Sequence, residues 1–592
     1  MPQNEPTIVK QDEVNIRRAV IHRPLRWFVR RYPVKKLFIH DVTLIGIMMV
    51  LAGCGMIYEF LLSHYAARVL GATEVAIFGV FTVMIASMGL GAFAAGRFKC
   101  AFTSFAWLEL LIGIIGATAI LFIAGMITFT TMLPSLIATT YGLSGIVPNG
   151  GIIVYLQIAA KSLPYVVAFI LGVLIGAEIP LIARVREQLY GMHLQNNTGT
   201  IYGADYIGAG IGATIFVIWL LTMDITSAAI IAASANVAAG LLFLYRYKQH
   251  IKYSGLLLFG HLFVSVIIII IALNGTQWEA SLEDMLYKDK VVHSMHTRYQ
   301  HVVITERIMD PRQAPVYSLH INGHTQFSSF DEQIYHSMLV YPAMAASARH
   351  DSVLIIGGGD GLALRDVLKW NPQRVVLLDL DQSLVDFFSQ PYKKGGRVVN
   401  DALLTLNNKS FSDDRVEVRI GDAFLSVDEL LAAEAIFDTI IIDLPDPNHP
   451  DLNKLYSSRF YAKLKHLLAG DGALVTQSTS PYHAPEAFIS IGKTIKHAGF
   501  SSVDQYHANV PSFGEWGWTI ATRAGGSAKQ RLERLAKLPL DDGWMTRDVM
   551  LGAFAFYKDF YQNIENIKIN RINSNVLYEY HRLGWARENG VF

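Results

Sequence analysis

The chain has 592 residues, of which 52% are hydrophobic and only 17% are charged. Because soluble proteins carry about 25% charged residues, this composition disfavours a wholly soluble globular protein and excludes disorder as the main state. Fifty basic and 49 acidic residues leave a net charge of +1, which gives no support to nucleic-acid binding. The two cysteines, Cys54 and Cys100, lie in apolar sequence and disfavour a disulfide scaffold or a cysteine zinc site.

The first segment, residues 1–40, is polar and basic, with eight arginines and lysines between Arg17 and Lys36. Long basic segments before a first apolar stretch favour retention in the cytoplasm and differ from a cleavable signal peptide. We interpret this segment as a cytoplasmic determinant of topology. A basic strip that rests on anionic lipid is the alternative.

The next region, residues 41–273, predicts a transmembrane domain of about seven helices. Its apolar stretches are near the length of about 20 residues that crosses a bilayer, and they are rich in Gly, Ala, Ile and Leu. The predicted spans are 41–62, 75–96, 104–127, 151–182, 205–222, 226–245 and 254–273. Lys161 and Pro164 predict a broken helix in the fourth span, and 128–147 is apolar enough for a re-entrant segment or an eighth span.

From about residue 290 the pattern becomes that of an α/β protein. Short runs rich in Val, Ile and Leu alternate with helical stretches, which indicates parallel strands buried on both faces. The predicted strands are 353–357, 375–381, 416–422, 438–444 and 473–478. The last segment, 525–592, has a mostly helical pattern whose aromatic residues indicate packing rather than chemistry.

The most informative local motif follows the first of these strands. Gly357, Gly358 and Gly359 precede Asp360 and a predicted helix, and glycines at such a turn let a ligand approach the backbone closely. Asp379 ends the next strand, where an acid is well placed to accept hydrogen bonds from ribose hydroxyls. This arrangement is typical of a nucleoside-binding site, although a tight turn alone is the simpler alternative.

Further acids follow the ends of successive strands. Since ligands of open parallel sheets bind beyond the carboxyl ends of the strands, we expect these acids to converge on one crevice. They are Asp360, Asp379, Asp422, Asp443 and Asp446. Carboxylates repel phosphate, which argues against NAD, FAD or ATP, whereas a sulfonium nucleoside together with a polyamine fits the charge.

Residues 295–522 resemble the spermidine synthase family, the polyamine aminopropyltransferases, and the apolar N-terminal half resembles the extension of its multi-pass membrane members. The resemblance rests on the order and spacing of several motifs. These are Tyr299-Gln300, Asn322 to Gln326, Asp331-Glu332, Tyr335-His336, the Gly357–Gly361 turn, Asp379, Gly421-Asp422, Asp443 to Pro447, Leu455-Tyr456, Phe460-Tyr461 and 510–518.

The resemblance implies a small β-domain at 290–330 and a Rossmann-like, methyltransferase-type domain at 331–524. It also implies aminopropyl transfer from decarboxylated S-adenosylmethionine, a co-substrate, to putrescine or another polyamine, without a cofactor. The products would be spermidine and 5′-methylthioadenosine. A homodimer is an expected assembly, since dimers are common in the family.

The resemblance also assigns the site residues. The implied donor site contains Gln300, Gln326, Gly357, Gly359, Asp360, Asp379 and Asp422. Asp443 would be the general base, and Tyr335, His336 and Asp446 would bind the acceptor. The implied reaction requires no metal, and the irregular spacing of the histidines at 293–336 disfavours a ligand cluster. Ser337 and Phe513 depart from the family pattern and leave the identity of the acceptor open.

Two alternatives remain open. One is a methyltransferase that uses S-adenosylmethionine, although Asp360 would repel the carboxylate of its methionine moiety. The other is a polyamine transporter or sensor with a non-catalytic soluble half, because acids such as Glu178 lie in apolar stretches.

We expect location in the cell (inner) membrane. Seven spans would put the catalytic half outside, but the donor is made in the cytoplasm, which favours the cytoplasmic side.

Overall fold

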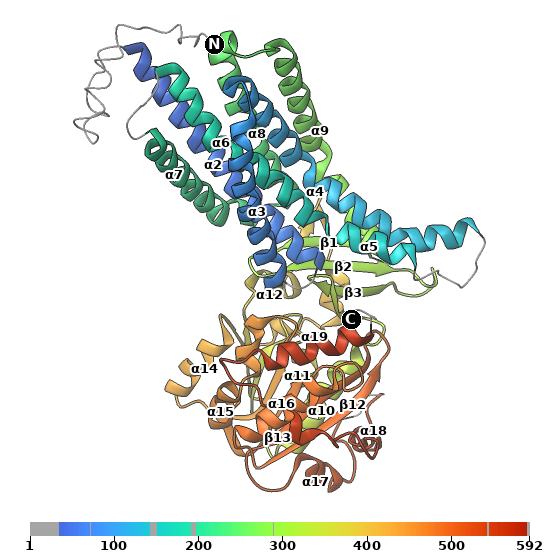
Figure 1. Ribbon diagram of the computed structural model, residues 1–592. Coiled ribbons are helices and arrows are strands. Elements are labelled where there is room, and N and C mark those ends of the chain that lie inside the picture. Colours follow the sequence, from blue (N-terminus) through green and yellow to red (C-terminus); the bar gives the residue numbers. More distant parts are fainter. Residues whose placement is uncertain are drawn as a thin grey trace. The chain divides into compact units, whose positions relative to one another are not determined.

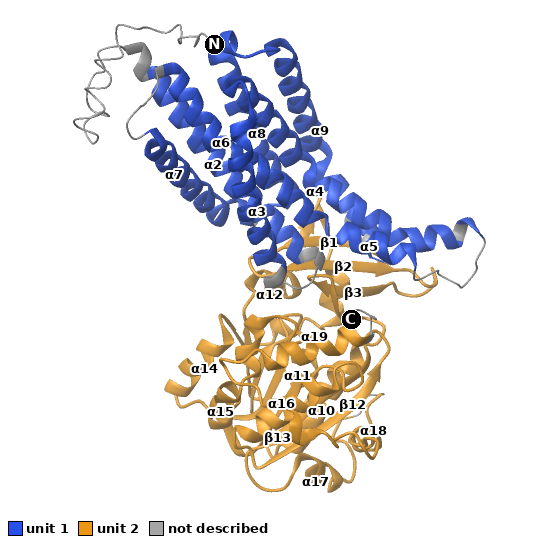
Figure 2. Ribbon diagram, in the orientation of Figure 1, with its two compact units in different colours: residues 1–288 blue, residues 289–592 orange. Residues whose placement is uncertain are grey.

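The computed structural model describes residues 35–70, 73–141, 151–190, 197–287, 289–540 and 544–588. Most of the predicted basic segment 1–40 therefore lies outside the described residues. The chain divides into two compact units, Met1–Lys288 (unit 1) and Asp289–Phe592 (unit 2), drawn in Figures 1 and 2. The two units are described separately.

Unit 1 is helical in its described part. Seven of its helices are long and apolar enough to cross a membrane, which agrees with the predicted number. They are α2 (Lys35–Leu70), α3 (Thr73–Ala94), α4 (Ala101–Thr140), α6 (Leu163–Tyr190), α7 (Asn197–Ile218), α8 (Ile225–Tyr247) and α9 (Ser254–Leu286). Shorter elements are η1 (Ala95–Arg97), α5 (Ile152–Lys161), η2 (Leu220–Thr222) and η3 (Lys248–His250).

Two predictions about broken helices have different outcomes. The predicted interruption in 151–182 is confirmed, because α5 ends at Lys161 and α6 begins at Leu163. The separate or re-entrant segment predicted at 128–147 is wrong as far as Thr140, since α4 continues through it with Pro134 inside. No charged residue occurs between Glu109 and Thr140, and the hydroxyl of Thr130 donates to the carbonyl of Ile127 within the helix.

Close backbone contacts and one buried ion pair hold unit 1 together. A Cβ on Gly212 of α7 would overlap the backbone of Gly53 in α2, so only glycine permits this approach. Arg186 of α6 pairs with Asp41 of α2 at 2.6 Å, and both side chains are buried. Arg186 also donates to the side chain of Asn197 at 2.7 Å. Small residues and a satisfied ion pair are typical of packed membrane helices.

Unit 2 begins with a four-stranded antiparallel sheet in the order β1-β2-β3-β4. Its strands are β1 (Lys290–His296), β2 (His301–Arg307), β3 (Val316–Ile321) and β4 (His324–Ser328). Asn322 and Gly323 connect β3 to β4 with φ angles of 51° and 82°. Asn and Gly tolerate this left-handed conformation, which two-residue hairpin turns require. The turn explains why asparagine suits position 322.

The larger sheet has seven strands in the order β12-β13-β11-β10-β5-β6-β9. They are β5 (Ser352–Gly357), β6 (Arg374–Asp379), β9 (Val416–Ile420), β10 (Phe437–Asp443), β11 (Leu468–Gln477), β12 (Ser502–Val510) and β13 (Gly514–Thr522). Strand β13 is antiparallel to both neighbours, and β9, β6, β5, β10 and β11 are mutually parallel. The five predicted strands are confirmed. The hairpin β12–β13 went unpredicted because polar residues interrupt its apolar ones.

Helices cover both faces of this sheet. Alternate strand residues point to opposite faces, so Ile355 and Leu354 belong to different clusters of buried side chains. The helices are α10 (Glu332–Ala346), α11 (Leu362–Leu368), α12 (Gln382–Ser389), α13 (Asp401–Leu406), α14 (Ala423–Ala432), α15 (Ser458–Leu467) and α16 (Pro485–His497). Short elements are the hairpin β7 (Lys393–Lys394) and β8 (Arg397–Val398), η4 (Ser410–Ser412) and η5 (Pro450–Tyr456).

The mostly helical pattern predicted for 525–592 is only partly right. The described elements are α17 (Ala528–Glu533), α18 (Arg547–Gly552), η6 (Ile564–Asn566) and α19 (Val576–Glu588), and turns connect them. The asparagine-rich stretch 563–575 favours turns over helix. Helix α19 is nonetheless part of the core, because Leu577 is fully buried. The segment is therefore built into unit 2 rather than appended to it.

Candidate active site

A glycine turn joins β5, an interior strand of the large sheet, to α11. Gly357, Gly358 and Gly361 have φ angles of 82°, 70° and 76°, which favour glycine. The backbone N–H of Gly358 donates to the carbonyl of Asp443 at 3.1 Å, so the turn is fastened to the end of β10. This edge lies where the connections from β5 and β10 leave in opposite directions, the usual ligand position in open α/β sheets.

Asp443 lies at the centre of this edge, paired in register with Gly357. The hydroxyl of Tyr335 in α10 donates to Asp443 Oδ1 at 2.8 Å. Burial and the nearby carboxylate of Asp360 raise the pKa of Asp443 to about 6, while the charge of His336 and the Tyr335 hydrogen bond oppose the rise. Asp443 is therefore a carboxylate that is ionised at neutral pH but close to protonation.

Asp360 and Asp379 lie on the β6 side of the glycine turn. A Cβ on Gly359 would stand 2.8 Å from Asp379 Oδ2, so a larger residue there would displace the carboxylate. Burial raises the pKa of Asp379 to about 6, and Asp360 adds to the rise. Burial also raises the pKa of Asp360, whose Oδ1 accepts from the backbone of Leu362 at 2.9 Å. Three desolvated carboxylates thus lie at this edge, and Asp360 acts electrostatically on the other two.

A buried ionic network supports the acids from α10 and α11. Glu332 accepts from Arg365 at 2.8 and 3.0 Å and contacts His336 Nδ1 at 2.9 Å. Burial alone would lower the pKa of His336, but Glu332, Asp360 and Asp443 raise it to about 9. His336 is consequently a buried cation between Glu332 and the acids of the site.

Asp446 has partners from distant parts of unit 2. Its Oδ2 accepts from the hydroxyl of Thr479 at 3.3 Å and lies 3.0 Å from Nε2 of His581 on α19. Its buried Oδ1 has no hydrogen-bond partner among the described residues. Sequence reasoning missed His581, because no motif marks it and the C-terminal segment was assigned to packing. Its position in an aromatic helix, before Trp585, was the one available signal.

The remaining predicted residues are engaged in other contacts. Asp422 accepts from the backbone of Phe424 at the start of α14 and forms an ion pair with Lys454, which sequence reasoning also missed. The amide of Gln300 donates to Asp381 at 3.0 Å, beside Asp379. The amide of Gln326 donates to a carbonyl in its own hairpin. The structure thus brings together Tyr335, His336, Gly357, Gly359, Asp360, Asp379 and Asp443, whereas Asp422 and Gln326 make separate contacts.

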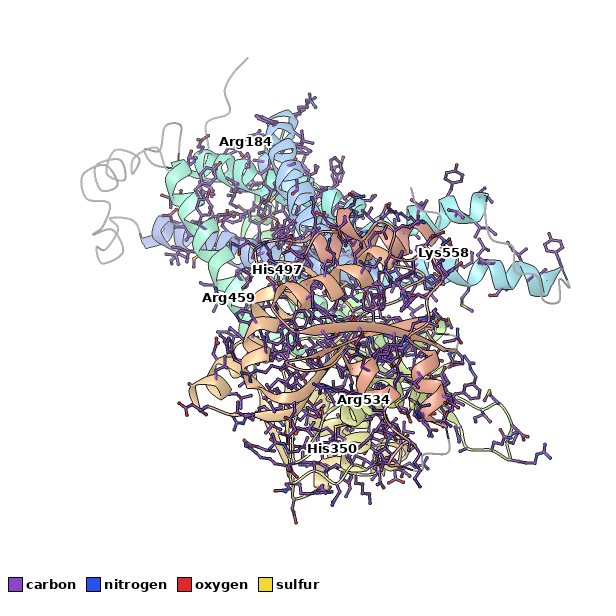
Figure 3. All side chains as sticks on the ribbon, turned by 90° about the horizontal axis from the view of Figure 1, so that it is seen from below. Arg184, His350, Arg459, His497, Arg534 and Lys558 are labelled. Carbon is purple, nitrogen blue, oxygen red and sulfur yellow. The ribbon has the colours of Figure 1, made fainter. Side chains whose placement is uncertain are left out.

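Basic side chains of unit 2 are distributed over separate elements. Figure 3 labels Arg459 of α15, His497 of α16, Arg534 after α17 and Lys558 after α18. Within the described ranges, no group of three or more His, Cys, Asp or Glu residues is arranged to hold a metal ion.

Comparison with known proteins defines the class. A profile of the spermine/spermidine synthase domain matches residues 332–531. A polyamine aminopropyltransferase of Shewanella oneidensis is 54% identical over 93% of this chain and 96% of that protein. A polyamine aminopropyltransferase of Oceanobacillus iheyensis is 29% identical over 90% of this chain and 95% of that protein. The crystal structure of spermidine synthase from Thermotoga maritima matches 47% of this chain and 89% of that one, with 24% identity and a TM-score of 0.40.

The fold and these matches define a transferase with a Rossmann-like α/β domain and a small β-sheet region. The chain belongs to the polyamine aminopropyltransferase family.

Proposed function

We propose that the chain transfers an aminopropyl group from decarboxylated S-adenosylmethionine to putrescine. The products are spermidine and 5′-methylthioadenosine. The observation that carries this proposal is the group of desolvated carboxylates around Asp443, which suits a sulfonium donor and an amine acceptor. In this reaction the acceptor nitrogen bonds to the carbon beside the sulfonium, the C–S bond breaks, and its electron pair returns to sulfur.

The donor occupies the side of the crevice formed by β5 and β6. Asp379 accepts from the ribose hydroxyls, Asp360 holds the amine of the aminopropyl arm, and Asp422 faces the adenine amino group. Gly357 and Gly359 keep this surface free of side chains, since a Cβ at either position would overlap a neighbour. Gln300 and Gln326 are the remaining residues of the proposed donor site, although the structure pairs them with Asp381 and with the carbonyl of His324.

Asp443 is the general base of the reaction. A protonated amine has no lone pair for attack, so a carboxylate has to orient the acceptor and take its proton. With a pKa raised to about 6, Asp443 is ionised at pH 7 and is a stronger base than an ordinary aspartate. Tyr335 holds the carboxylate in place through its hydroxyl.

Asp446 binds the far amine of the acceptor. Its unpartnered Oδ1 is the oxygen available to an ammonium group, while Oδ2 is engaged by Thr479 and His581. His336 contributes positive charge behind Asp443 and Asp360, which keeps both carboxylates from being fully neutralised. We therefore add His581 to the acceptor site as a positioning residue.

The nucleoside product distinguishes this proposal from methyl transfer. Asp360 would repel the carboxylate of intact S-adenosylmethionine, and decarboxylation removes that conflict. The test incubates the purified full-length chain with each donor and a panel of diamines. We expect 5′-methylthioadenosine from the decarboxylated donor and putrescine. Formation of S-adenosylhomocysteine from intact donor, with no 5′-methylthioadenosine, would overturn the proposal.

We propose further that unit 1 lies in the cell membrane, with the seven apolar helices as spans. The support is their length and composition. Homodimerisation stays a prediction. So do the domain boundaries, at residues 40, 273, 290, 330 and 524. The side of the membrane stays a prediction as well, because the origin of the donor favours the cytoplasm and seven spans after a cytoplasmic start favour the opposite side. Protease accessibility of unit 2 in oriented vesicles decides between them.

A further inference from the structure

Unit 1 contains a group of buried polar side chains that the proposed reaction does not use. We define the inner polar cluster as Tyr58, Glu109, Glu178, Asn236 and His261, one residue from each of α2, α4, α6, α8 and α9. Each of the five is at most 2% exposed. Each also has a buried oxygen or nitrogen without a hydrogen-bond partner among the described residues.

Several contacts place these side chains together. Asn236 donates to Glu109 Oε2 at 2.8 Å. A Cβ on Gly240 would stand 2.6 Å from His261 Nε2 and 3.2 Å from Glu109 Cβ, so both residues border the same glycine. Glu109 and Glu178 lie within electrostatic range of each other and of the Tyr58 hydroxyl. The five helices also contact one another in pairs.

The unpartnered atoms are almost all hydrogen-bond acceptors. They are Glu109 Oε1, Glu178 Oε2, Asn236 Oδ1 and His261 Nε2, together with the Tyr58 hydroxyl, which can donate or accept. Nε2 of neutral His261 is an acceptor because its Nδ1 lies 2.9 Å from the carbonyl of Leu257 and has to carry the proton. The amide nitrogen of Asn236 is already engaged, which leaves its oxygen.

Such a group can be satisfied by a partner that donates hydrogen bonds and carries positive charge. A buried polar atom without a partner is destabilising, and an unpaired buried carboxylate is more so. Within the described ranges, no lysine or arginine forms an ion pair with Glu109 or Glu178. A primary ammonium group has three N–H donors, no acceptor and one positive charge, and therefore matches this set of atoms.

We propose that the inner polar cluster binds the primary ammonium group of an alkylamine within the helices of unit 1. The group would bind between Glu109 and Glu178, with Asn236 Oδ1, His261 Nε2 and the Tyr58 hydroxyl as further acceptors. This binding site is additional to the acceptor site at Asp446. The choice of putrescine as a probe rests on the proposed function, whereas the choice of an ammonium group rests on the acceptor atoms alone.

Equilibrium binding of labelled putrescine to the full-length chain, without donor, tests the proposal. The Asp446→Asn variant removes acceptor binding in unit 2 and is expected to retain one saturable site. Adding Glu178→Gln or Glu109→Gln is expected to weaken that site by at least about tenfold, the effect of losing one charge-assisted hydrogen bond. Adding Glu59→Gln, a change of a buried acid of α2 outside the inner polar cluster, is the matched control and is expected to leave binding unchanged. Wild-type elution and thermal unfolding show that each variant is folded.

Competing ions test the role of N–H donors. Methylammonium is expected to displace putrescine from the Asp446→Asn variant, whereas tetramethylammonium, which has no N–H, is not. Equal displacement by both ions, displacement by Na⁺ alone, or loss of all saturable binding in Asp446→Asn would overturn the proposal while leaving the proposed reaction intact. Saturable binding that depends on Glu178 in a chain unable to form 5′-methylthioadenosine would support it and overturn the proposed reaction instead.

Discussion

At the residue scale, carboxyl groups of the same kind have opposite electrostatic surroundings within unit 2. Asp443 and Asp379 are desolvated beside other acids, and their pKa values rise to about 6. Burial would raise the pKa of Glu332 too, but His336 and Arg365 outweigh it and hold that pKa at about 2. Glu332 is therefore suited to permanent charge and structural support, whereas Asp443 is suited to proton transfer.

The hydroxyl of Tyr335 contributes to the lower pH limit of the proposed reaction, because it lowers the pKa of Asp443. Asp443 has to be deprotonated to act, so kcat/KM is expected to fall as pH drops through about 6. The Tyr335→Phe change removes the hydrogen bond that favours the ionised carboxylate and so raises the pKa of Asp443. The acidic limb of the pH profile of kcat/KM is then expected to move to higher pH. Tyr506→Phe is the control, since that hydroxyl donates to a backbone carbonyl. An unmoved limb in Tyr335→Phe would refute this role.

The Glu332 network also predicts how stability depends on pH. The raised pKa of His336 gives stability that is complete below its usual 6.5 and lost as pH rises through about 9. The lowered pKa of Glu332 gives stability that is complete above its usual 4.5 and lost as pH falls through about 2. The Glu332 network therefore contributes most to the stability of the fold between pH 4.5 and pH 6.5, where both contributions are complete.

Breaking this network tests its contribution. Glu332→Gln leaves the buried charges of Arg365 and His336 without their anion and is expected to cost about 3 kcal/mol of unfolding free energy. Thermal unfolding of the full chain between pH 5 and 9 measures the effect. Arg374→Gln, which removes an exposed ion pair with Glu417, is the comparison and is expected to cost under about 1 kcal/mol. Equal losses in the two variants would contradict this account.

The acids of the site could largely be predicted from the sequence, because they follow strand ends and parallel strands end at one edge. Their partners could not. Tyr335 was placed near the acceptor, but its hydrogen bond to Asp443 depends on the rotation of α10 against the sheet. The partners of Asp446 and Asp422, His581 and Lys454, come from segments whose fold is set by long-range packing rather than by a local motif.

At the element scale, α19 is the part of unit 2 that the sequence interpretation undervalued. This helix lies outside the matched domain, 332–531, and yet delivers His581 to Asp446. The parallel strands were predictable from continuous apolar runs, whereas α19 has aromatic residues without clear amphipathicity. The position of this helix follows from its packing against α16, which no local motif predicts.

A single added methyl group at Gly584 is expected to disturb the packing of α19. A Cβ on Gly584 would stand 2.6 Å from the carbonyl of His483 and 2.8 Å from the Cα of Ala484, so Gly584→Ala has to shift the helix. We expect a KM for putrescine that rises several-fold, with the KM for the donor unchanged, because His581 moves relative to Asp446. Gly552→Ala is the matched control, since no atom lies within 4 Å of its Cβ position. A rise in both KM values would indicate general damage instead.

At the scale of the whole molecule, two units of different composition share one chain. The fold class of each unit could be predicted from the sequence, because apolar stretches of bilayer length and short buried strands differ in length and periodicity. The inner polar cluster was not predictable as a group, because Glu109 and Glu178 are isolated acids in separate stretches. The two acids lie close together because α4 packs against α6 and α8, and this packing could not be predicted from the sequence.

The seven apolar helices predict firm attachment to the membrane. A chain with several spans buries far more apolar surface in the bilayer than a peripheral protein does, so we expect it to remain in the membrane pellet after an alkaline carbonate wash. Detergent is expected to release it. Immunoblotting of pellet and supernatant measures the outcome, with an established peripheral protein as the control. Release by carbonate alone would contradict the assignment of unit 1 to the membrane.

The most direct test of the account measures 5′-methylthioadenosine formation by the wild type and by Asp443→Asn at pH 7.5, with saturating decarboxylated donor and putrescine. The account predicts a kcat lower by at least about 10²-fold in the variant, the usual contribution of a general base, with donor affinity retained. Asp428→Asn, on the surface of α14, is expected to match the wild type. A variant at Asp443 that turns over within a few-fold of the wild type would contradict the account.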